Sequence, residues 1–176
     1  MTCIAAVETD NGVWMGGDSA ATEGDGLLTV TTPKVFRLPG YLIGYTESFR
    51  LGQLIRYRLR PPEQRCDDPL EHLATVFVDE LRKLITKGGV KGDGPDELDG
   101  SLLVAYRGRL YSIESDLAVL AATHPYQAIG CGADLAIGSL ASTSGRPDQR
   151  IRLALATAAR HSTGVAPPFL IVNDQE

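Results

Sequence analysis

The spacing of apolar residues divides the chain into a strand-rich beginning, a helical middle and a mixed remainder. Over residues 2–45, short apolar runs are separated by turn residues, a pattern that is typical of β-strands. The Asn11-Gly12 and Pro39-Gly40 pairs predict turns between these runs. The strands expected here span residues 2–8, 13–18, 27–32, 34–38 and 41–45.

Two helices are expected next, because apolar residues then recur every three or four positions. The first begins near Leu51 and ends at Arg60, since two prolines follow it. The second spans about 70–87 and carries one apolar stripe, formed by Leu70, Leu73, Phe77, Leu81 and Leu84. Val76 and Val78 lie off that stripe, and this surplus predicts a surface that contacts another chain.

The remainder begins with a segment rich in glycine and acidic residues, 88–100, which predicts a mobile surface loop. Asp148 is expected to be the N-cap of the last helix, after Pro147. These elements predict an α+β fold in which two antiparallel sheets face each other and helices cover both outer faces, an αββα sandwich. The remaining strands are expected at 101–106, 109–113 and 169–172, and the remaining helices at 133–143 and 148–162.

Composition narrows the class of protein without identifying it. The chain has 176 residues, is 43% hydrophobic and carries a formal net charge of -5, which suits one domain over residues 1–176 around a single core. The acidic balance argues against nucleic acid or an anionic membrane as the main partner, because both attract basic surfaces. No apolar stretch approaches the roughly 20 residues that span a bilayer, and no secretory leader is evident.

Cysteines, histidines and glycines give no sign of a bound metal or nucleotide. The cysteines are odd in number and lack ligand-like spacing, which predicts reduced thiols in the cytoplasm. In Gly130-Cys131-Gly132 the third glycine of a dinucleotide loop is replaced by Leu135. We therefore expect no cofactor and no metal in this chain. The residues considered are Cys3, Cys66 and Cys131, and His72, His124 and His161.

Candidate chemistry is concentrated near the amino terminus. Thr2 is small enough for the initiator Met1 to be trimmed, which would leave a hydroxyl nucleophile and a free α-amine on one residue. An α-amine has a pKa of roughly 7.7 to 8.0, so it can act as the base that activates the hydroxyl. Asp18 ends one predicted strand and Lys34 begins another. A lysine ammonium nearby would lower the pKa of the α-amine, and a carboxylate would orient that lysine.

The spacing of these residues resembles a known family. The segments Thr2-Cys3-Ile4-Ala5-Ala6-Val7, Gly16-Gly17-Asp18-Ser19, Lys34-Val35-Phe36 and Leu42-Ile43-Gly44 look like the opening of proteasome β-subunits and of HslV, the bacterial ATP-dependent peptidase subunit. The resemblance is clear over residues 2–46, weaker over 100–141 and slight elsewhere. It implies the N-terminal nucleophile hydrolase fold, an αββα sandwich. It also implies that Thr2, Asp18 and Lys34 are the nucleophile, the orienting acid and the activating cation of a threonine endopeptidase.

Three further site residues are expected by the same resemblance, each where the chain departs from the family pattern. Where the family has a glycine whose amide stabilises the oxyanion, this chain has Ser48, which can still donate its backbone N–H. Thr163 matches a supporting serine near the carboxyl terminus, although the acidic residue that accompanies it is missing. Cys131 stands where a serine lies near the threonine amine, and a thiol hydrogen-bonds more weakly than a hydroxyl.

The resemblance also implies a substrate pocket. Arg50 would place a cation at or near it, which favours acidic or polar residues before the cut, and Thr22 would hold the substrate backbone as an added strand. The pocket residues expected are Ala21, Thr22, Thr32, Thr46 and Arg50.

The resemblance further implies self-assembly into hexameric or heptameric rings, which are expected to be stacked in pairs and to degrade unfolded polypeptides inside a chamber. An AAA+ ATPase would be the partner, so ATP would act through that partner and not through this chain. Two alternatives stay open. One is a stand-alone amidohydrolase of the same superfamily acting on a small amide. The other is an inactive ring or scaffold subunit, which is suggested by the altered glycine segment and by a retained Met1.

Overall fold

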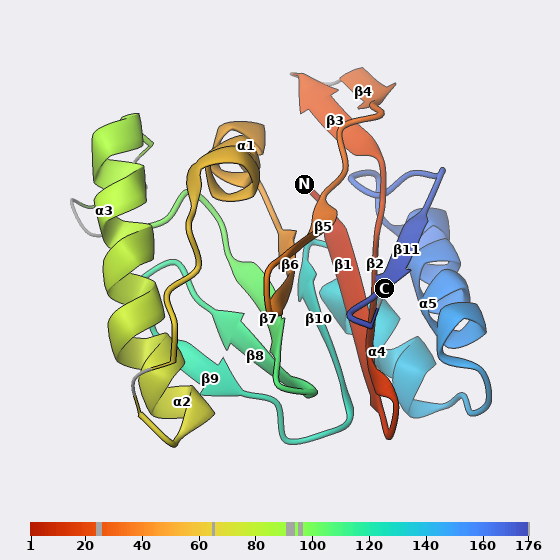
Figure 1. The fold of residues 1–176 in the computed structure, drawn as a ribbon. Coiled ribbons are helices and arrows are strands. Elements are labelled where there is room, and N and C mark those ends of the chain that lie inside the picture. Colours follow the sequence, from red (N-terminus) through yellow and green to blue (C-terminus); the bar gives the residue numbers. More distant parts are fainter. Residues whose placement is uncertain (24–25, 65, 91–93, 95–96, 176) are drawn as a thin grey trace.

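Two antiparallel sheets form the centre of the molecule. The computed structural model describes residues 1–23, 26–64, 66–90, 94 and 97–175. One sheet has the strand order β10-β1-β2-β11, and the other has the order β5-β6-β7-β8-β9 (Figure 1). The strands of the first sheet are β1 (Cys3–Thr9), β2 (Gly12–Gly17), β10 (Tyr126–Gly130) and β11 (Leu170–Asn173). Those of the second are β5 (Val35–Leu38), β6 (Tyr41–Tyr45), β7 (Leu102–Tyr106), β8 (Arg109–Ile113) and β9 (Val119–Ala121).

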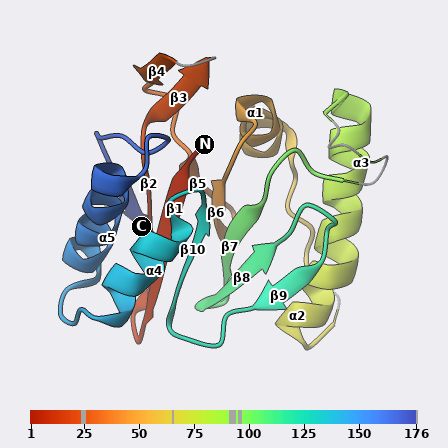
Figure 2. The ribbon, with the colours of Figure 1, turned by 180° about the vertical axis from the view of Figure 1, so that it is seen from behind.

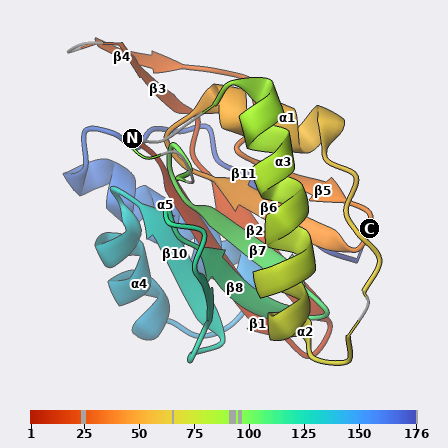
Figure 3. The ribbon, with the colours of Figure 1, turned by 90° about the vertical axis from the view of Figure 1, so that its left-hand side faces the viewer.

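Helices cover the outer face of each sheet. The β5–β9 sheet is covered by α1 (Phe49–Arg58) and by a helix made of α2 (Pro69–His72), the π-helical segment η1 (Leu73–Phe77) and α3 (Val78–Gly88), as Figure 3 shows. The other sheet is covered by α4 (Ala133–Ala141) and α5 (Pro147–His161), as Figure 2 shows from behind. The layers are therefore helix, sheet, sheet, helix, which confirms the predicted α+β, αββα sandwich.

Apolar side chains fill each of the three spaces between these four layers. Between the two sheets, Ile4 and Met15 of one sheet pack with Leu42 and Leu103 of the other, all fully buried. The central strands β1 and β2 are thus covered on both faces, because α5 packs on their other side. A strand buried on both faces reads as a continuous apolar run, and this explains why the first strands were evident in the sequence.

A small hairpin stands apart from both sheets. Strands β3 (Ala20–Glu23) and β4 (Gly26–Thr29) pair only with each other, and they project beyond the ends of the helices (Figure 3). The strand predicted at 27–32 is therefore wrong in extent. It ends at Thr29, and Pro33 follows soon after, where a missing N–H prevents further pairing. Leu27 and Leu28 are 48% and 54% exposed on this hairpin.

The helix over 70–87 contains a feature that its apolar stripe does not reveal. The π-helical segment Leu73–Phe77 adds a residue to one turn, which shifts the direction of the side chains that follow it. Val78 is consequently 4% exposed and belongs to the core of this chain. The prediction that Val76 and Val78 form surplus contact surface is therefore wrong for Val78, and Val76 is half-buried.

Several element boundaries differ from the prediction. The last helix has Arg146 as its N-cap and Pro147 in its first turn, so Asp148 lies inside the helix, where it pairs with the Arg146 guanidinium. Proline is well suited to the first helical position because its missing N–H has no partner there in any case. The strands β9 and β10 were not predicted: β9 has only three residues, and β10 pairs with β1, a segment distant in sequence.

Of the predicted mobile loop at 88–100, residues 91–93, 95 and 96 lie outside the described residues, and Gly88 is the last residue of α3. Within the described part of the chain, no helix is long and apolar enough to cross a membrane. The same residues include no group of three or more histidine, cysteine or acidic side chains placed to hold a metal ion.

Candidate active site

Three of the predicted site residues meet at one end of the sheets. Thr2 directly precedes β1, Asp18 directly follows β2, and Lys34 directly precedes β5. Antiparallel pairing sets Ile4 opposite Gly17, so the residues just beyond this pair lie beside each other. The side chains of Thr2, Asp18 and Lys34 are buried, with residue exposures of 2%, 3% and 2%. The name Thr2 cluster is used below for these three residues.

The Asp18 carboxylate is held by four donors. Its Oδ1 accepts from the Cys3 backbone N–H at 3.0 Å and from Lys34 Nζ at 2.9 Å. Its Oδ2 accepts from the backbone N–H groups of Ala20 at 2.8 Å and Ala166 at 3.3 Å. Four donors on two oxygens fix the position and the orientation of this carboxylate.

Lys34 links this carboxylate to the candidate nucleophile. Its Nζ donates to Asp18 at 2.9 Å and to the hydroxyl oxygen of Thr2 at 3.0 Å. Burying an ammonium is costly, and Asp18 supplies the opposite charge that offsets this cost. The cluster therefore places a compensated positive charge directly against a threonine hydroxyl, which stabilises negative charge that develops on that oxygen.

Met1 is present and occupies the space next to this hydroxyl. The Thr2 hydroxyl donates to the Met1 carbonyl oxygen, which Lys34 Nζ also approaches at 3.5 Å. The Met1 α-ammonium forms an ion pair with Glu47 at 3.2 Å. Glu47 has a left-handed backbone with φ of 59°, and it stands in the segment where the family has glycine. The ion pair between Met1 and Glu47 was not predicted. From the sequence, only the absence of the family's glycine from this segment was evident.

A glycine lets β10 approach the nucleophile. Gly130 has a φ of +92°, and a Cβ atom at this position would lie 2.2 Å from the carbonyl oxygen of Thr2. The next residues contact the same carbonyl group, since the Gly132 N–H and the Cys131 thiol each lie 3.4 Å from its oxygen. The end of β10 thus sets the position of the Thr2 backbone.

Cys131 lies beside the Thr2 nitrogen, as the sequence predicted, but Thr163 does not reach it. The Thr2 backbone N–H donates to Cys131 Sγ at 3.4 Å. The hydroxyl that lies near this sulfur, at 3.5 Å, belongs to Ser162, whereas Thr163 is exposed. The assignment of the supporting hydroxyl was therefore off by one residue, because α5 ends at His161 and the chain turns immediately after it.

The two cysteines near Thr2 differ in reactivity. Cys3 is fully buried between the sheet and α5. Burial, together with the Asp18 and Cys131 charges, raises the pKa of the Cys3 thiol to about 12, although Lys34 acts in the opposite direction. Cys131 is exposed. A thiol needs to ionise to react, so Cys131 is the more reactive of the pair.

Ser48 is the N-cap of α1. Its hydroxyl accepts from the Leu51 backbone N–H at 3.3 Å, which satisfies one of the free donors in the first helical turn. The first turn of a helix favours negative charge, because unpaired N–H groups gather there. The Ser48 position is therefore compatible with a developing oxyanion, and its role as the donor stays a prediction.

The expected pocket residues do not all face one space. Thr32 lines a cavity of about 260 Å³ between residues 31–33 and α1. The cation that lines this cavity is Arg56, whereas Arg50 is exposed in the first turn of α1 and does not line it. Thr46 is buried, and its hydroxyl accepts from the Ser101 backbone N–H at 2.9 Å.

The other two expected pocket residues lie on the projecting hairpin. Ala21 and Thr22 belong to β3, where they pair with Leu28 and Leu27 of β4. Ala21 is half-buried and Thr22 is exposed. The hairpin lies next to the Thr2 end of the molecule (Figure 1), so the expected strand-like contact with a substrate backbone stays a prediction.

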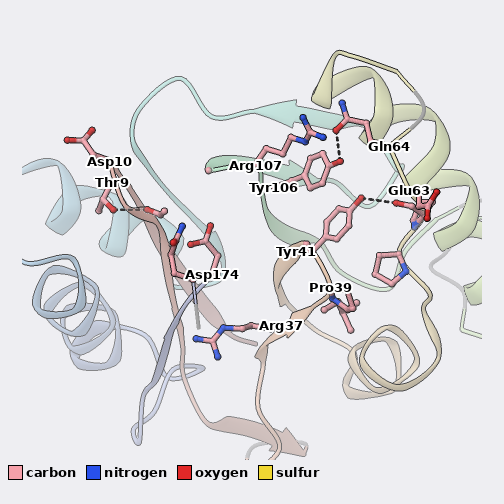
Figure 4. Close-up of a pocket in the computed structure, with 17 residues that line it drawn as sticks. Thr9, Asp10, Arg37, Pro39, Tyr41, Glu63, Gln64, Tyr106, Arg107 and Asp174 are labelled. Carbon is pink, nitrogen blue, oxygen red and sulfur yellow. Dashed lines mark hydrogen bonds between the residues drawn. The ribbon is translucent and has the colours of Figure 1, made fainter.

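A much larger cavity lies away from the Thr2 cluster. It measures about 910 Å³ and is formed by the turns that join β1 to β2, β5 to β6 and β7 to β8, together with residues 61–64 and 174–175. Figure 4 shows Tyr41, Tyr106 and Arg107 on one side of it, with Arg37 and Asp174 on the other. None of the six candidate catalytic residues lines this cavity.

Comparisons with known proteins find similarity in structure, not in sequence. No family model matches the sequence, and no curated protein matches it either. Among solved structures, BPH from Thiobacillus denitrificans is 17% identical with a TM-score of 0.82, and the match covers 98% of this chain and 97% of that one. HslV from Trypanosoma brucei is 18% identical with a TM-score of 0.70, covering 99% and 100%. Anbu from Yersinia bercovieri is 20% identical with a TM-score of 0.69, covering 98% and 81%.

The chain has the fold of HslV and Anbu. The resemblance on which the sequence interpretation rests is thereby confirmed at the level of the fold, across nearly the whole chain. At this level of identity a shared fold does not by itself assign a reaction. The function must be argued from the Thr2 cluster.

Proposed function

We propose that this chain is a threonine peptidase whose nucleophile is the Thr2 hydroxyl. The observation that carries the proposal is the Lys34 ammonium, which lies 3.0 Å from that hydroxyl and 2.9 Å from Asp18 in a buried site. A lone lysine near a threonine would be ordinary. A buried lysine that is compensated by a carboxylate and directed at a hydroxyl at the start of the chain fits an activated N-terminal nucleophile.

The reaction requires removal of Met1, which frees the Thr2 α-amine to act as the base. The hydroxyl oxygen then attacks a peptide carbonyl carbon while its proton passes to the α-amine. The C–N bond breaks, and the leaving amine takes the proton, so an ester on Thr2 remains. Water then cleaves this ester by the same proton transfers. Lys34 stabilises the hydroxyl oxygen as it loses its proton, and the Ser48 N–H is the proposed donor to the carbonyl oxygen.

A comparison supports this chemistry. The structure of Thiobacillus denitrificans BPH in complex with epoxomicin matches this chain with a TM-score of 0.82 over 98% of its length. Epoxomicin is an epoxyketone, a class of inhibitor that needs both a hydroxyl and a free amine on one residue. We propose the same reactive pair at Thr2 of this chain.

Hydrolysis of a fluorogenic peptide library tests the proposal. Thr2→Ala should abolish hydrolysis and leave the fold intact, since it removes only a hydroxyl and a methyl group. Thr75→Ala is the matched control, because the Thr75 hydroxyl donates only to the Glu71 carbonyl on an exposed helical turn. The control should retain the parent rate. Full hydrolysis by Thr2→Ala would show that the threonine mechanism is wrong.

We further propose that the chain assembles with copies of itself into hexameric or heptameric rings, stacked in pairs, that degrade unfolded polypeptides with an AAA+ ATPase as partner. The fold similarity to HslV and to Anbu, for which a helical assembly is known from Pseudomonas aeruginosa, supports self-assembly. The exposed Leu27, Leu28 and Tyr57 supply apolar contact surface. Native mass spectrometry tests this. A monomer or simple dimer would reject the chamber and favour the stand-alone hydrolase of a small amide.

A further inference from the structure

A second polar site lies between residues 31–33 and α1, behind the segments that carry the Thr2 cluster. It is the cavity of about 260 Å³ that Thr32 lines, and its floor and walls include Tyr45, Gly52, Gln53 and Arg56. Hydroxyl, amide and guanidinium groups therefore converge on a space that suits a small ligand.

Tyr45 lines this cavity, and its hydroxyl is buried without a hydrogen-bond partner among the described residues. Tyr45 is 2% exposed, and no described residue lies within hydrogen-bonding distance of its hydroxyl. A buried polar group without a partner is costly, and such groups are few in folded proteins. The hydroxyl end of the ring lies against Gly52, where a Cβ atom would be 2.2 Å from the ring carbon that carries the oxygen. Glycine at this position thus makes room for the end of the tyrosine.

Arg56 brings an uncompensated positive charge to the same space. It follows Gly52 by one helical turn and is half-buried. Its guanidinium lies over the rings of Phe36 and Tyr57, at 5.9 Å and 5.3 Å. Among the described residues, no carboxylate forms an ion pair with it. Tyr45 and Arg56 line the same cavity. Burial raises the pKa of Tyr45 to about 12, and the Arg56 charge opposes that rise.

We propose that this cavity binds one small oxyanion, a carboxylate or a phosphate group, between the Arg56 guanidinium and the Tyr45 hydroxyl. An oxyanion satisfies both groups together: it accepts from the unpartnered hydroxyl and matches the guanidinium, which cannot lose its charge. A neutral ligand would leave the cation uncompensated, and a cation would be repelled. The hydroxyl groups of Thr31 and Thr32 and the amide of Gln53 are further donors at the wall.

The position of this site connects it to the candidate nucleophile. Residues 31–33 lead directly into Lys34, and α1 begins directly after Ser48. An oxyanion held by Thr32 and Arg56 would therefore tie together two segments that each carry a candidate catalytic residue. The inference does not depend on the proposed peptidase function, because it rests on the cavity alone.

Binding is best measured on the full chain carrying Thr2→Ala, so that no turnover of a ligand interferes. The probes are sodium phosphate, sodium acetate and N-acetyl-aspartyl-amide, each titrated against chloride at constant ionic strength to hold charge screening fixed. The readout is the side-chain Nε–Hε NMR signal of Arg56. A saturable shift is expected, with a Kd of about 1 mM, as befits one charge-assisted contact to a small ion.

Two variants and one control make the test specific. Arg56→Gln should weaken binding by at least about tenfold, the cost of one charge-assisted hydrogen bond. Tyr45→Phe should weaken binding severalfold, yet be no less stable than the parent in chloride, because it removes an unpartnered hydroxyl. For these variants binding is followed through the Gly52 backbone amide signal. Arg58→Gln removes an equal charge from an exposed position of the same helix that does not line the cavity, and it should bind as the parent does.

The titrations answer two questions: whether the site exists, and which kind of anion it binds. Saturation by phosphate or acetate indicates a free anion as ligand, whereas saturation only by N-acetyl-aspartyl-amide indicates an acidic side chain of a substrate. Either result supports the site. Shifts that do not saturate, or losses in Arg58→Gln equal to those in Arg56→Gln, would overturn it. Loss of peptidase activity would not bear on this result, since the parent for binding is already inactive.

Discussion

The two ends of the sheets hold buried polar clusters of opposite character. At one end, Thr2, Asp18 and Lys34 form a charged cluster with an ion pair of 2.9 Å. At the other end, the Tyr41 hydroxyl lies 2.8 Å from the His72 ring, and the Tyr106 hydroxyl donates to Gln64 at 2.7 Å. The rings of Tyr41 and Tyr106 stack at 4.5 Å between centroids. Tyr41, Gln64, His72 and Tyr106 are called the Tyr41 cluster below.

This difference separates a reactive arrangement from a structural one. The Tyr41 and Tyr106 hydroxyls pair with neutral groups, which adds hydrogen bonds and aromatic packing without burying a full charge. His72 Nδ1 is buried and has no hydrogen-bond partner among the described residues. The Thr2 cluster keeps two full charges away from water and directs one of them at a hydroxyl, which is costly for stability and useful for catalysis. The cavity of about 910 Å³ lies at the Tyr41 end, so cavity size alone points away from the Thr2 cluster.

The largest expected contrast comes from Lys34→Ala against Tyr106→Phe. Lys34→Ala should lower peptide hydrolysis by about 10²- to 10³-fold and cost about 3–5 kcal/mol of stability, because Asp18 stays buried without its cation. Tyr106→Phe loses one hydrogen bond, for about 0.5–1.5 kcal/mol, with the hydrolysis rate unchanged. Urea unfolding and initial rates measure both. Equal losses of activity in the two variants would remove the distinction between the two ends.

A backbone contact at the Thr2 end gives the next largest effect. In Gly130→Ala the new methyl group collides with the Thr2 carbonyl. In addition, a residue with a side chain is strained in the left-handed backbone conformation, which costs about 1–2 kcal/mol of folding stability. A displaced nucleophile should lower the rate by about 100-fold. Gly138→Ala is the control, since a Cβ atom there meets nothing within 4 Å, and it should keep the parent rate. Unchanged hydrolysis by Gly130→Ala would show that β10 does not set the position of Thr2.

The Tyr41 cluster should respond to pH through His72. Burial, and secondly the Arg107 charge, lowers the pKa of His72 below its ordinary value of 6.5. The unfolded chain therefore binds a proton more readily than the folded chain does. Stability should fall as pH decreases from 6.5 toward the lowered pKa, and this contribution should be constant above 6.5.

Urea unfolding of the parent and of His72→Gln at several pH values gives the free energy of unfolding as a function of pH. The difference between the two curves is the contribution of His72. His124→Gln is the control, because His124 is exposed and should leave the profile unchanged. If the free energy of unfolding changed equally steeply with pH below 6.5 in the parent and in His72→Gln, the role of His72 would be refuted.

The smallest expected effect is at the edge of the Thr2 cluster. Cys131→Ser exchanges a weak donor for a stronger one, so the hydrolysis rate should change by less than about tenfold, the worth of one hydrogen bond. Iodoacetamide near pH 8 should modify Cys131 and leave Cys3 intact, because burial raises the Cys3 pKa to about 12. Peptide mapping by mass spectrometry measures this. Modification of Cys3 at the rate of Cys131 would contradict the assigned burial.

The sequence was sufficient to locate the Thr2 cluster because its members lie next to strands with strong local patterns. A two-residue turn at Asp10-Asn11, next to the predicted Asn11-Gly12 pair, fixes the register of β1 and β2, and this brings Asp18 to the beginning of β1. Double burial of these strands gives long apolar runs, which made them easy to recognise. The hairpin places Thr2 and Asp18, whereas Lys34 joins them from the other sheet and was grouped with them by the spacing that resembles the family. Their catalytic roles stay predictions.

Features that depend on distant contacts were missed. Ser162 replaces Thr163 beside Cys131 because α5 ends one residue earlier than expected, at His161. The π-helical turn at 73–77 leaves no mark on the apolar stripe, and β10 forms by pairing with β1, which is distant in sequence.

The most direct test of the account is the intact mass of the protein before and after incubation with epoxomicin. The account predicts a chain that begins at Thr2, gains the mass of one inhibitor molecule, and loses this reactivity in Thr2→Ala but not in Thr75→Ala. Peptide mapping should place the adduct on Thr2. A chain that keeps Met1 and gains no mass, or an adduct that persists in Thr2→Ala, would contradict the claim that Thr2 is the nucleophile.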